Sequence, residues 1–176
     1  MHIFLTGAVQ VGKSTIITKV MYSSGLTVGG FRTSFGPDRG EPDRLLYLYA
    51  AGEPPALDEP HGVVRFVNRI PVPIPGRFEA LGIPLLRRAR AHAGLILMDE
   101  CGFLESDAVA FQAEILKTLD GETPVLGVLR EGLPGWTPAV AAHPKVRLVT
   151  VTRENRNSLP AQLNQWVQGS HLDEFI

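Results

Sequence analysis

Short apolar runs and longer stretches of helical periodicity alternate along most of the chain. Apolar or β-branched runs predict strands at residues 2–6, 27–33, 45–50, 63–68, 94–99, 123–129 and 146–152. Apolar residues recur at helical spacing over residues 14–24, 78–92, 106–119 and about 158–168. Ser106 is the expected N-cap of the third helix, because its hydroxyl can accept a hydrogen bond from a free N–H of the first turn.

The strand pattern predicts the fold class. Runs such as LILM and VLGVL are apolar on both faces, as expected for a parallel sheet covered by helices on each side. We therefore expect an α/β fold, a three-layer α/β/α sandwich with a mostly parallel sheet and right-handed crossovers. The length of 176 residues is typical of one domain, so residues 1–176 are predicted to form a single domain. Residues 35–75 are rich in Pro and Gly and carry two strand-like runs, which we interpret as a small hairpin insertion.

Composition excludes several classes of protein. The formal net charge of −1 gives no long-range attraction to nucleic acid or to an anionic membrane. The single cysteine, Cys101, excludes an intramolecular disulfide and a cysteine-cluster zinc site. No leader pattern opens the chain and no apolar run is long enough to span a bilayer, so we expect a cytoplasmic protein. Arginine outnumbers lysine, which suits recognition of phosphate or carboxylate, although a GC-rich genome would produce the same bias.

The first loop carries the strongest motif. The pattern G-x-x-x-x-G-K-[ST] occurs at Gly7, Gly12, Lys13 and Ser14, with a predicted strand before it and a helix after it. Glycines let successive backbone N–H groups point at phosphates, and the helix adds the positive end of its dipole. Lys13 would bridge two phosphates, and the Ser14 hydroxyl would coordinate Mg²⁺. The residues expected to bind the nucleotide here are Gly7, Ala8, Val9, Gln10, Val11, Gly12, Lys13, Ser14 and Thr15.

Two adjacent acids, Asp99 and Glu100, end the apolar strand at residues 94–99. Ligands bind at the carboxyl ends of strands in α/β sheets, so both acids are expected beside the phosphate loop. Asp99 would help Ser14 to hold Mg²⁺, and Glu100 would orient and polarise the attacking water. The alternative is that a strand simply ends in solvated acids.

Three motifs in this order resemble a known family, the nucleoside-triphosphatases of thermophilic-archaeal and human cancer-related type. Besides the phosphate loop, the central motif D-E-I-G-x-M-E is matched by Asp99, Glu100, Gly102 and Glu105, with Cys101 and Leu104 in the Ile and Met places. The late motif V-T-x-E-N-R-[DN] is matched by Thr152, Glu154, Asn155 and Arg156. The chain departs from the family over residues 34–74, where Arg32, Arg39 and Arg44 have no clear counterparts in the family's arginine-rich hairpin.

The resemblance implies a RecA-like P-loop NTPase core that hydrolyses the γ-phosphate of ATP, GTP, CTP and UTP with Mg²⁺. It also implies that the strand at residues 124–129 inserts between the phosphate-loop strand and the strand that ends in the acids. That arrangement would leave Glu100 one shell away from the γ-phosphate, as suits a residue that activates water.

The late motif follows the last strand, at the same edge of the sheet as the phosphate loop. We hypothesise that Arg156 or Arg153 contacts the γ-phosphate or stacks on the base, with Asn155 also at the nucleotide. The alternative is that these residues form the first, solvated turn of the last helix, with Asn155 as its N-cap.

The sequence therefore predicts a nucleoside-triphosphate phosphohydrolase with Mg²⁺ as cofactor and Lys13, Glu100 and Arg156 as catalytic residues. Two alternatives stay open: a nucleotide or small-metabolite kinase, if the insertion forms an acceptor lid, and a nucleotide-dependent binding or switch module with slow hydrolysis. The sequence indicates no nucleic-acid or membrane partner and identifies no protein partner.

Overall fold

A single mixed sheet organises the molecule. The computed structural model describes residues 1–130 and 135–169, and within them eight strands hydrogen-bond in the order β5-β4-β3-β2-β6-β7-β1-β8. The strands are β1 (His2–Thr6), β2 (Val28–Phe35), β3 (Arg44–Ala50), β4 (Gly62–Val67), β5 (Ile70–Pro73), β6 (Leu95–Cys101), β7 (Val125–Leu129) and β8 (Val146–Thr150).

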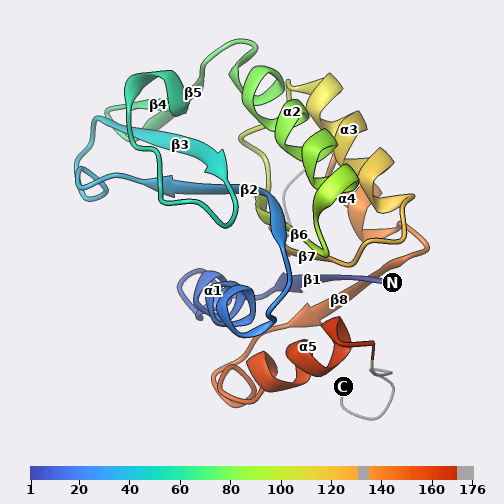
Figure 1. The fold of residues 1–176 in the computed structure, drawn as a ribbon. Coiled ribbons are helices and arrows are strands. Elements are labelled where there is room, and N and C mark those ends of the chain that lie inside the picture. The colour runs from blue at the N-terminus through green and yellow to red at the C-terminus, as the bar shows by residue number, and fades with distance from the viewer. Residues whose placement is uncertain (131–134, 170–176) are drawn as a thin grey trace.

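Helices cover both faces of this sheet (Figure 1). In the described part of the chain they are α1 (Lys13–Ser23), α2 (Arg77–His92), α3 (Val109–Leu119), α4 (Thr137–Ala141) and α5 (Leu159–Val167), with a short 3₁₀ helix, η1, at Glu59–His61. Helices α1 and α5 pack together on one face, and α2 packs with α3 on the other. The predicted three-layer α/β/α sandwich is confirmed. None of the helices in the described ranges has the length and apolar character needed to cross a membrane.

The parallel half of the sheet brings the predicted motifs to one edge. Strands β2, β6, β7, β1 and β8 run parallel to one another. The expectation that residues 124–129 insert between the other two motif strands is confirmed, because β7 lies between β6 and β1. The phosphate loop after β1 and the acids at the end of β6 therefore lie on the same edge of the sheet, one strand apart.

The insertion extends the main sheet and does not stand apart as an isolated hairpin. Strand β3 pairs antiparallel with β2, and β4 and β5 continue the antiparallel ladder to the edge (Figure 1). Strand β5 was not predicted, because its sequence IPVP contains two prolines. A proline cannot donate to a ladder, but it is tolerated on an edge strand, and β5 is the outermost strand of the sheet.

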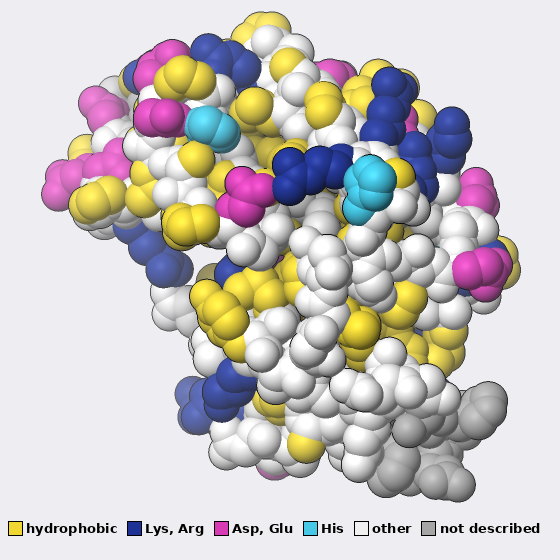
Figure 2. Space-filling view, viewed as in Figure 1, with side chains coloured by type: hydrophobic (Ala, Val, Ile, Leu, Met, Phe, Trp, Pro, Cys, Tyr) yellow, Lys and Arg dark blue, Asp and Glu magenta, His cyan; other side chains and the backbone are white. Residues whose placement is uncertain are grey.

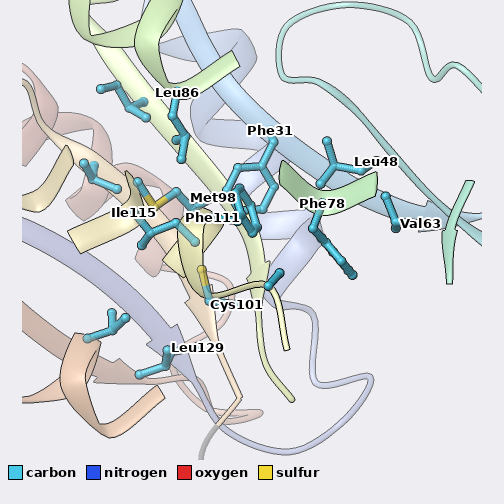
Figure 3. Packing of buried hydrophobic residues seen from close by; sticks show 14 of the residues in the cluster. Phe31, Leu48, Val63, Phe78, Leu86, Met98, Cys101, Phe111, Ile115 and Leu129 are labelled. Atoms are coloured by element: carbon cyan, nitrogen blue, oxygen red, sulfur yellow. The ribbon is translucent and has the colours of Figure 1, made fainter. Parts of the chain in front are cut away.

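Aromatic residues anchor the core between the sheet and α2–α3 (Figure 3). The Phe111 ring lies edge-on to Phe31, with centroids 5.1 Å apart, and stacks on Phe78 at 5.8 Å. Gly82 makes room for this ring, since a Cβ at that position would lie 2.2 Å from Phe111 Cε2. A second apolar cluster, which includes Ile17, joins α1 and α5 to the opposite face of the sheet. Packing on both faces fixes β6 and β1 in place.

The expected N-cap of one helix and the alternative N-cap considered for another were both wrong. Helix α3 begins at Val109 with Ala108 at the N-cap position, and the Ser106 hydroxyl instead donates to Phe103 O at 2.6 Å. Helix α5 has Ser158 at its N-cap position in place of Asn155. The side chains of Ser106 and Asn155 instead form hydrogen bonds within the turns that precede these helices. Short polar side chains can bond to nearby backbone groups in this way.

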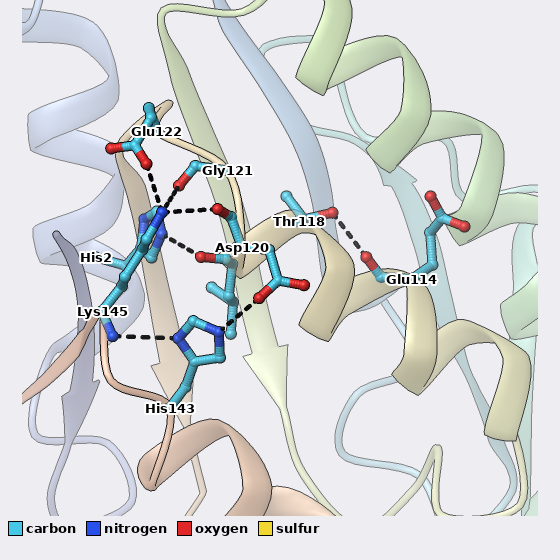
Figure 4. Close-up of polar contacts among 9 residues, drawn as sticks. His2, Glu114, Thr118, Asp120, Gly121, Glu122, His143 and Lys145 are labelled. Atoms are coloured by element: carbon cyan, nitrogen blue, oxygen red, sulfur yellow. Dashed lines mark hydrogen bonds and ion pairs between the residues drawn. The ribbon is translucent and has the colours of Figure 1, made fainter.

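His2 lies fully buried at the amino end of β1 (Figure 4). Its Nε2 donates to Leu119 O at 2.8 Å, and its Nδ1 accepts from Val125 N at 3.2 Å. Burial lowers the pKa of His2, and the nearby N-terminus, His143 and Lys145 lower it further, whereas the bond to Leu119 O raises it. Because Nδ1 accepts a hydrogen bond from a backbone N–H, the folded chain favours the neutral imidazole.

We expect the structure to lose stability as acid protonates His2 in the unfolded chain. Because the folded pKa is depressed, the contribution is complete above about pH 6.5 and falls as the pH drops below that value, by at most about 1.4 kcal/mol per pH unit. Urea unfolding of wild type and His2→Gln between pH 5 and 8 measures this difference. The variant His92→Gln, at an exposed position, is the control. A wild-type minus His2→Gln difference that stays constant with pH contradicts the assignment.

Candidate active site

The loop between β1 and α1 turns sharply at two glycines. Gly7 and Gly12 have φ values of +114° and +116°, in the region that favours glycine. A Cβ at Gly7 would lie 2.6 Å from Val151 O, so no larger residue fits there. Lys13 Nζ folds back and donates to Gly7 O and Ala8 O, both at 2.8 Å. Burial lowers the pKa of Lys13, while Glu100 and Asp99 act in the opposite direction.

Asp99, on β6, connects the start of α1 to the neighbouring strand β2. Its side chain is buried, and its Oδ1 accepts a hydrogen bond from Ser14 Oγ at 3.1 Å. Its Oδ2 accepts from Arg32 Nε at 3.3 Å and from Arg32 Nη2 at 3.2 Å. Burial raises the pKa of Asp99, and Arg32, Ser14 and Lys13 oppose the rise. The structure thus brings Ser14 and Asp99 together, as the sequence predicted, and adds Arg32.

Glu100 lies next to Asp99 and faces a different partner. Its Oε1 is 3.6 Å from Arg130 Nη1, and Arg130 directly follows β7. Burial raises the pKa of Glu100, and the charge of Arg130 opposes this rise. Sequence reasoning missed Arg130, although an arginine at the carboxyl end of an apolar parallel strand was a usable signal.

The loop that follows β6 is held by Glu105. This carboxyl is 4% exposed and accepts a hydrogen bond from Gly102 N, and burial raises the pKa of Glu105 to about 7. Trp136 Nε1 donates to Gly102 O at 2.8 Å. Cys101 is buried, and burial raises the pKa of its thiol well above the ordinary value, as expected for an unreactive apolar filler. Glu105 therefore orders the loop beside Glu100.

The late motif forms a turn over the phosphate loop. Asn155 Nδ2 donates to Thr150 O at 2.9 Å, and Asn155 Oδ1 accepts from Thr152 N at 2.8 Å, so this amide already holds the turn. Arg156 is exposed, and its Cδ lies 4.0 Å from the position of a Cβ built on Gly12. Arg153 is also exposed. Of these two arginines, Arg156 is the one shown to lie near the phosphate loop. Nucleotide binding by Asn155 stays a prediction.

A cavity of ≈ 560 Å³ adjoins these groups. Ser14, Asp99, Glu100 and Arg130 line it, and so do residues of the antiparallel strands. Arg32, Arg39 and Arg44, which the sequence left without counterparts, all line this cavity, and Arg69 joins them. In space-filling view the molecule is indented between the part formed by β3–β5 and the part formed by α1, with Lys or Arg side chains at both rims (Figure 2).

The fold and this constellation define a P-loop nucleotide-binding protein of the α/β class. A glycine-rich loop at a helix start, a lysine folded over it, and a hydroxyl beside a carboxylate on a nearby strand together define that class. The chain belongs to the NTPase family, whose profile matches residues 2–164. This confirms the resemblance stated from the motifs.

Known relatives cover nearly the whole chain. The nucleoside-triphosphatase THEP1 of Thermofilum pendens is 30% identical over 179 residues, which is 92% of each chain. The human cancer-related nucleoside-triphosphatase is 30% identical over 190 residues, or 96% of this chain and 97% of that protein. These relationships support the predicted enzyme class, a nucleoside-triphosphate phosphohydrolase.

Two solved structures share the fold. The solution structure of a human cancer-related nucleoside triphosphatase superposes with a TM-score of 0.69 at 28% identity and covers 97% of this chain and 98% of that one. The crystal structure of THEP1 from Aquifex aeolicus has a TM-score of 0.71 at 21% identity, with coverage of 96% and 99%. The second likeness supports the fold alone.

Proposed function

We propose that this chain is a Mg²⁺-dependent nucleoside-triphosphatase that cleaves the γ-phosphate and transfers it to water. One observation carries the proposal: the 3.1 Å hydrogen bond between Ser14 Oγ and Asp99 Oδ1 joins the phosphate-loop helix to the acid-bearing strand. Together with the family assignment, it supports a site in which a triphosphate lies between the two elements.

The residues at this point fit Mg²⁺. Ser14 and Asp99 present hard oxygen ligands, Ser14 Oγ and Asp99 Oδ1, within hydrogen-bond distance of each other. The described residues contain no cluster of three or more His, Cys, Asp or Glu, but a P-loop site needs only one carboxylate, because phosphates and waters complete the shell. When bound, the ion would neutralise charge on the phosphates.

The remaining roles follow from charge and position. The loop N–H groups and Lys13 would hold the phosphates, and Glu100 would align a water and accept its proton. A raised pKa suits that task, because a general base works best when its pKa approaches the ambient pH. Arg156 would reach the phosphates across Gly12. In Arg156→Ala, unchanged turnover together with unchanged nucleotide affinity would remove this residue from the site.

We expect phosphate release from ATP, GTP, CTP and UTP without any acceptor, and its loss when EDTA removes the metal. Steady-state release measured for each triphosphate, with excess Mg²⁺ and with EDTA, tests both points. Transfer that requires an added acceptor would support the kinase alternative instead, and tight binding with negligible turnover would support the switch. Tolerance of all four bases and a cytoplasmic location stay predictions.

A further inference from the structure

The cavity is far larger than an attacking water requires. An attacking water occupies roughly 30 Å³, whereas the cavity measures ≈ 560 Å³. That volume is within the range of small-molecule sites, about 300–1,000 Å³. Of the predicted nucleotide-binding residues at positions 7–15, only Ser14 contributes to its lining. Most of this space therefore lies beyond the phosphate loop.

The wall of the cavity away from the loop belongs to the antiparallel strands. In the sheet order β4-β3-β2-β6-β7-β1, strand β3 is four positions from β1, or roughly 19 Å at normal strand spacing. Arg44 on β3 and Phe66 on β4 line the cavity from this side. As seen from the phosphate loop, the arginines of these strands lie beyond Asp99 and Glu100.

Three of the lining arginines have no counter-ion among the residues that the structure describes. Arg32 pairs with Asp99 and Arg130 with Glu100. In contrast, no ion pair involving Arg39, Arg44 or Arg69 is found within residues 1–130 and 135–169. Glu105 also lines the cavity, so five arginines face three acids there, and the remaining net positive charge favours an anionic ligand.

Arg44 is held rigidly for such a role. Its guanidinium carbon lies 4.3 Å from the Phe66 ring centroid and 4.9 Å from that of Phe35. Its Nη1 donates to Glu41 O at 2.7 Å, while its buried Nε has no hydrogen-bond partner. A guanidinium held against two rings loses little conformational freedom when it binds an anion.

Arg69 occupies a position that local preference would assign to glycine. Asn68 and Arg69 form the two-residue turn between β4 and β5, with φ values of +50° and +68°. Such turns favour Asn-Gly, because both central residues take positive φ. An arginine in this strained position that also lines the cavity suggests a functional side chain.

We propose that the cavity binds a second, phosphate-bearing small molecule, with Arg39, Arg44 and Arg69 at its phosphate group. Guanidinium groups match phosphate geometry, and the volume leaves room for the organic part of a phosphate monoester. The site rests on the proposed function only in that it adjoins the triphosphate. The proposed site is the part of the cavity lined by Arg39, Arg44 and Arg69, away from Ser14 and Asp99, so both ligands bind at once.

Calorimetric titration tests this in two forms of the protein: ligand-free, and saturated with Mg²⁺ and a non-hydrolysable triphosphate analogue. The probes are inorganic phosphate, ribose 5-phosphate and AMP. We expect one equivalent of an ester to bind the saturated protein, more tightly than inorganic phosphate does. No binding of any probe to the saturated protein overturns the proposal, because residual binding to the ligand-free form would then reflect the phosphate loop.

The variant Arg39→Gln/Arg69→Asn removes two of the charges. Asparagine is chosen at position 69 because it tolerates the left-handed backbone conformation of that turn. We expect it to weaken ester binding at least roughly tenfold. The matched control is Arg65→Gln, since Arg65 is exposed on β4 beside the lining residue Phe66 but is not in the cavity wall. Equal losses in the control, or a parallel loss of affinity for the triphosphate analogue, overturn the assignment.

The two proposals fail separately. If the analogue does not bind but the ester binds in an arginine-dependent manner, the proposed function fails and the second site stands. If the analogue binds and no ester does, only the second site fails.

Discussion

Replacing Glu100 by glutamine is expected to reduce acceptor-free phosphate release by roughly 10²–10⁴-fold, the usual contribution of a general base. Glutamine has nearly the same shape but cannot accept the proton of the attacking water. The hydrogen bond between Ser14 and Asp99 does not involve Glu100, so nucleotide affinity should remain near that of wild type. Single-turnover release and equilibrium binding of a non-hydrolysable analogue measure the two effects independently.

A matched control separates this effect from a general loss of charge. Glu122 is exposed and pairs with Lys145 at the opposite edge of the sheet, so Glu122→Gln should leave release unchanged (Figure 4). Glu100→Gln also frees Arg130, whose side chain is 40% exposed and can be solvated, so little destabilisation is expected. Turnover that survives in Glu100→Gln would exclude Glu100 as the base.

Local patterns were sufficient to predict the elements that carry the motifs. The run at residues 2–6 was predicted as a strand, and β1 spans His2–Thr6. The helix after the loop was predicted at residues 14–24, and α1 spans Lys13–Ser23. The first is a continuous apolar run and the second has apolar residues at helical spacing, so neighbouring residues determine both. The short α4 and the proline-containing β5 have no such periodicity and were missed.

The cross-strand contacts of the site could not be predicted from local sequence patterns. Arg32 pairs with Asp99 because β2 and β6 are neighbours in a parallel register that places the two residues opposite each other. Arg130 meets Glu100 because β7 follows β6 in the sheet. Each contact depends on strand order, which a periodic pattern does not contain. The family resemblance supplied part of that order, namely the insertion of β7, but not the partners of the acids.

The insertion illustrates a second limit of sequence reasoning. Arg39, Arg44 and Arg69 are dispersed along residues 35–75 without a recognisable spacing. They line one cavity because the antiparallel strands fold back from β2 and bring the β2–β3 loop and the β4–β5 turn to the same side. Arg69 was the least predictable of the three, since its backbone conformation is one that local preferences disfavour.

Replacing Lys13 by methionine is expected to lower kcat/KM for a triphosphate by about 10³-fold, because hydrogen bonds to charged groups contribute roughly 1.5–3 kcal/mol each and Lys13 would make at least two to phosphate. Methionine retains the apolar stem but removes the ammonium group, which in the structure donates to Gly7 O and Ala8 O. Analogue binding, turnover and Tm should be measured together. Lys19→Met, an exposed position on the same helix, is the control.

The two substitutions should have different effects on binding and turnover, because they act on different parts of the proposed reaction. Lys13→Met should weaken analogue binding and turnover together, with Tm close to that of wild type, since the two carbonyls that it leaves belong to a solvated loop. Glu100→Gln should affect turnover alone. If Lys13→Met binds the analogue as tightly as wild type, the triphosphate does not lie on this loop. The bond between Ser14 and Asp99 would then be a structural contact between a helix and a strand, and the acids of β6 would need another substrate.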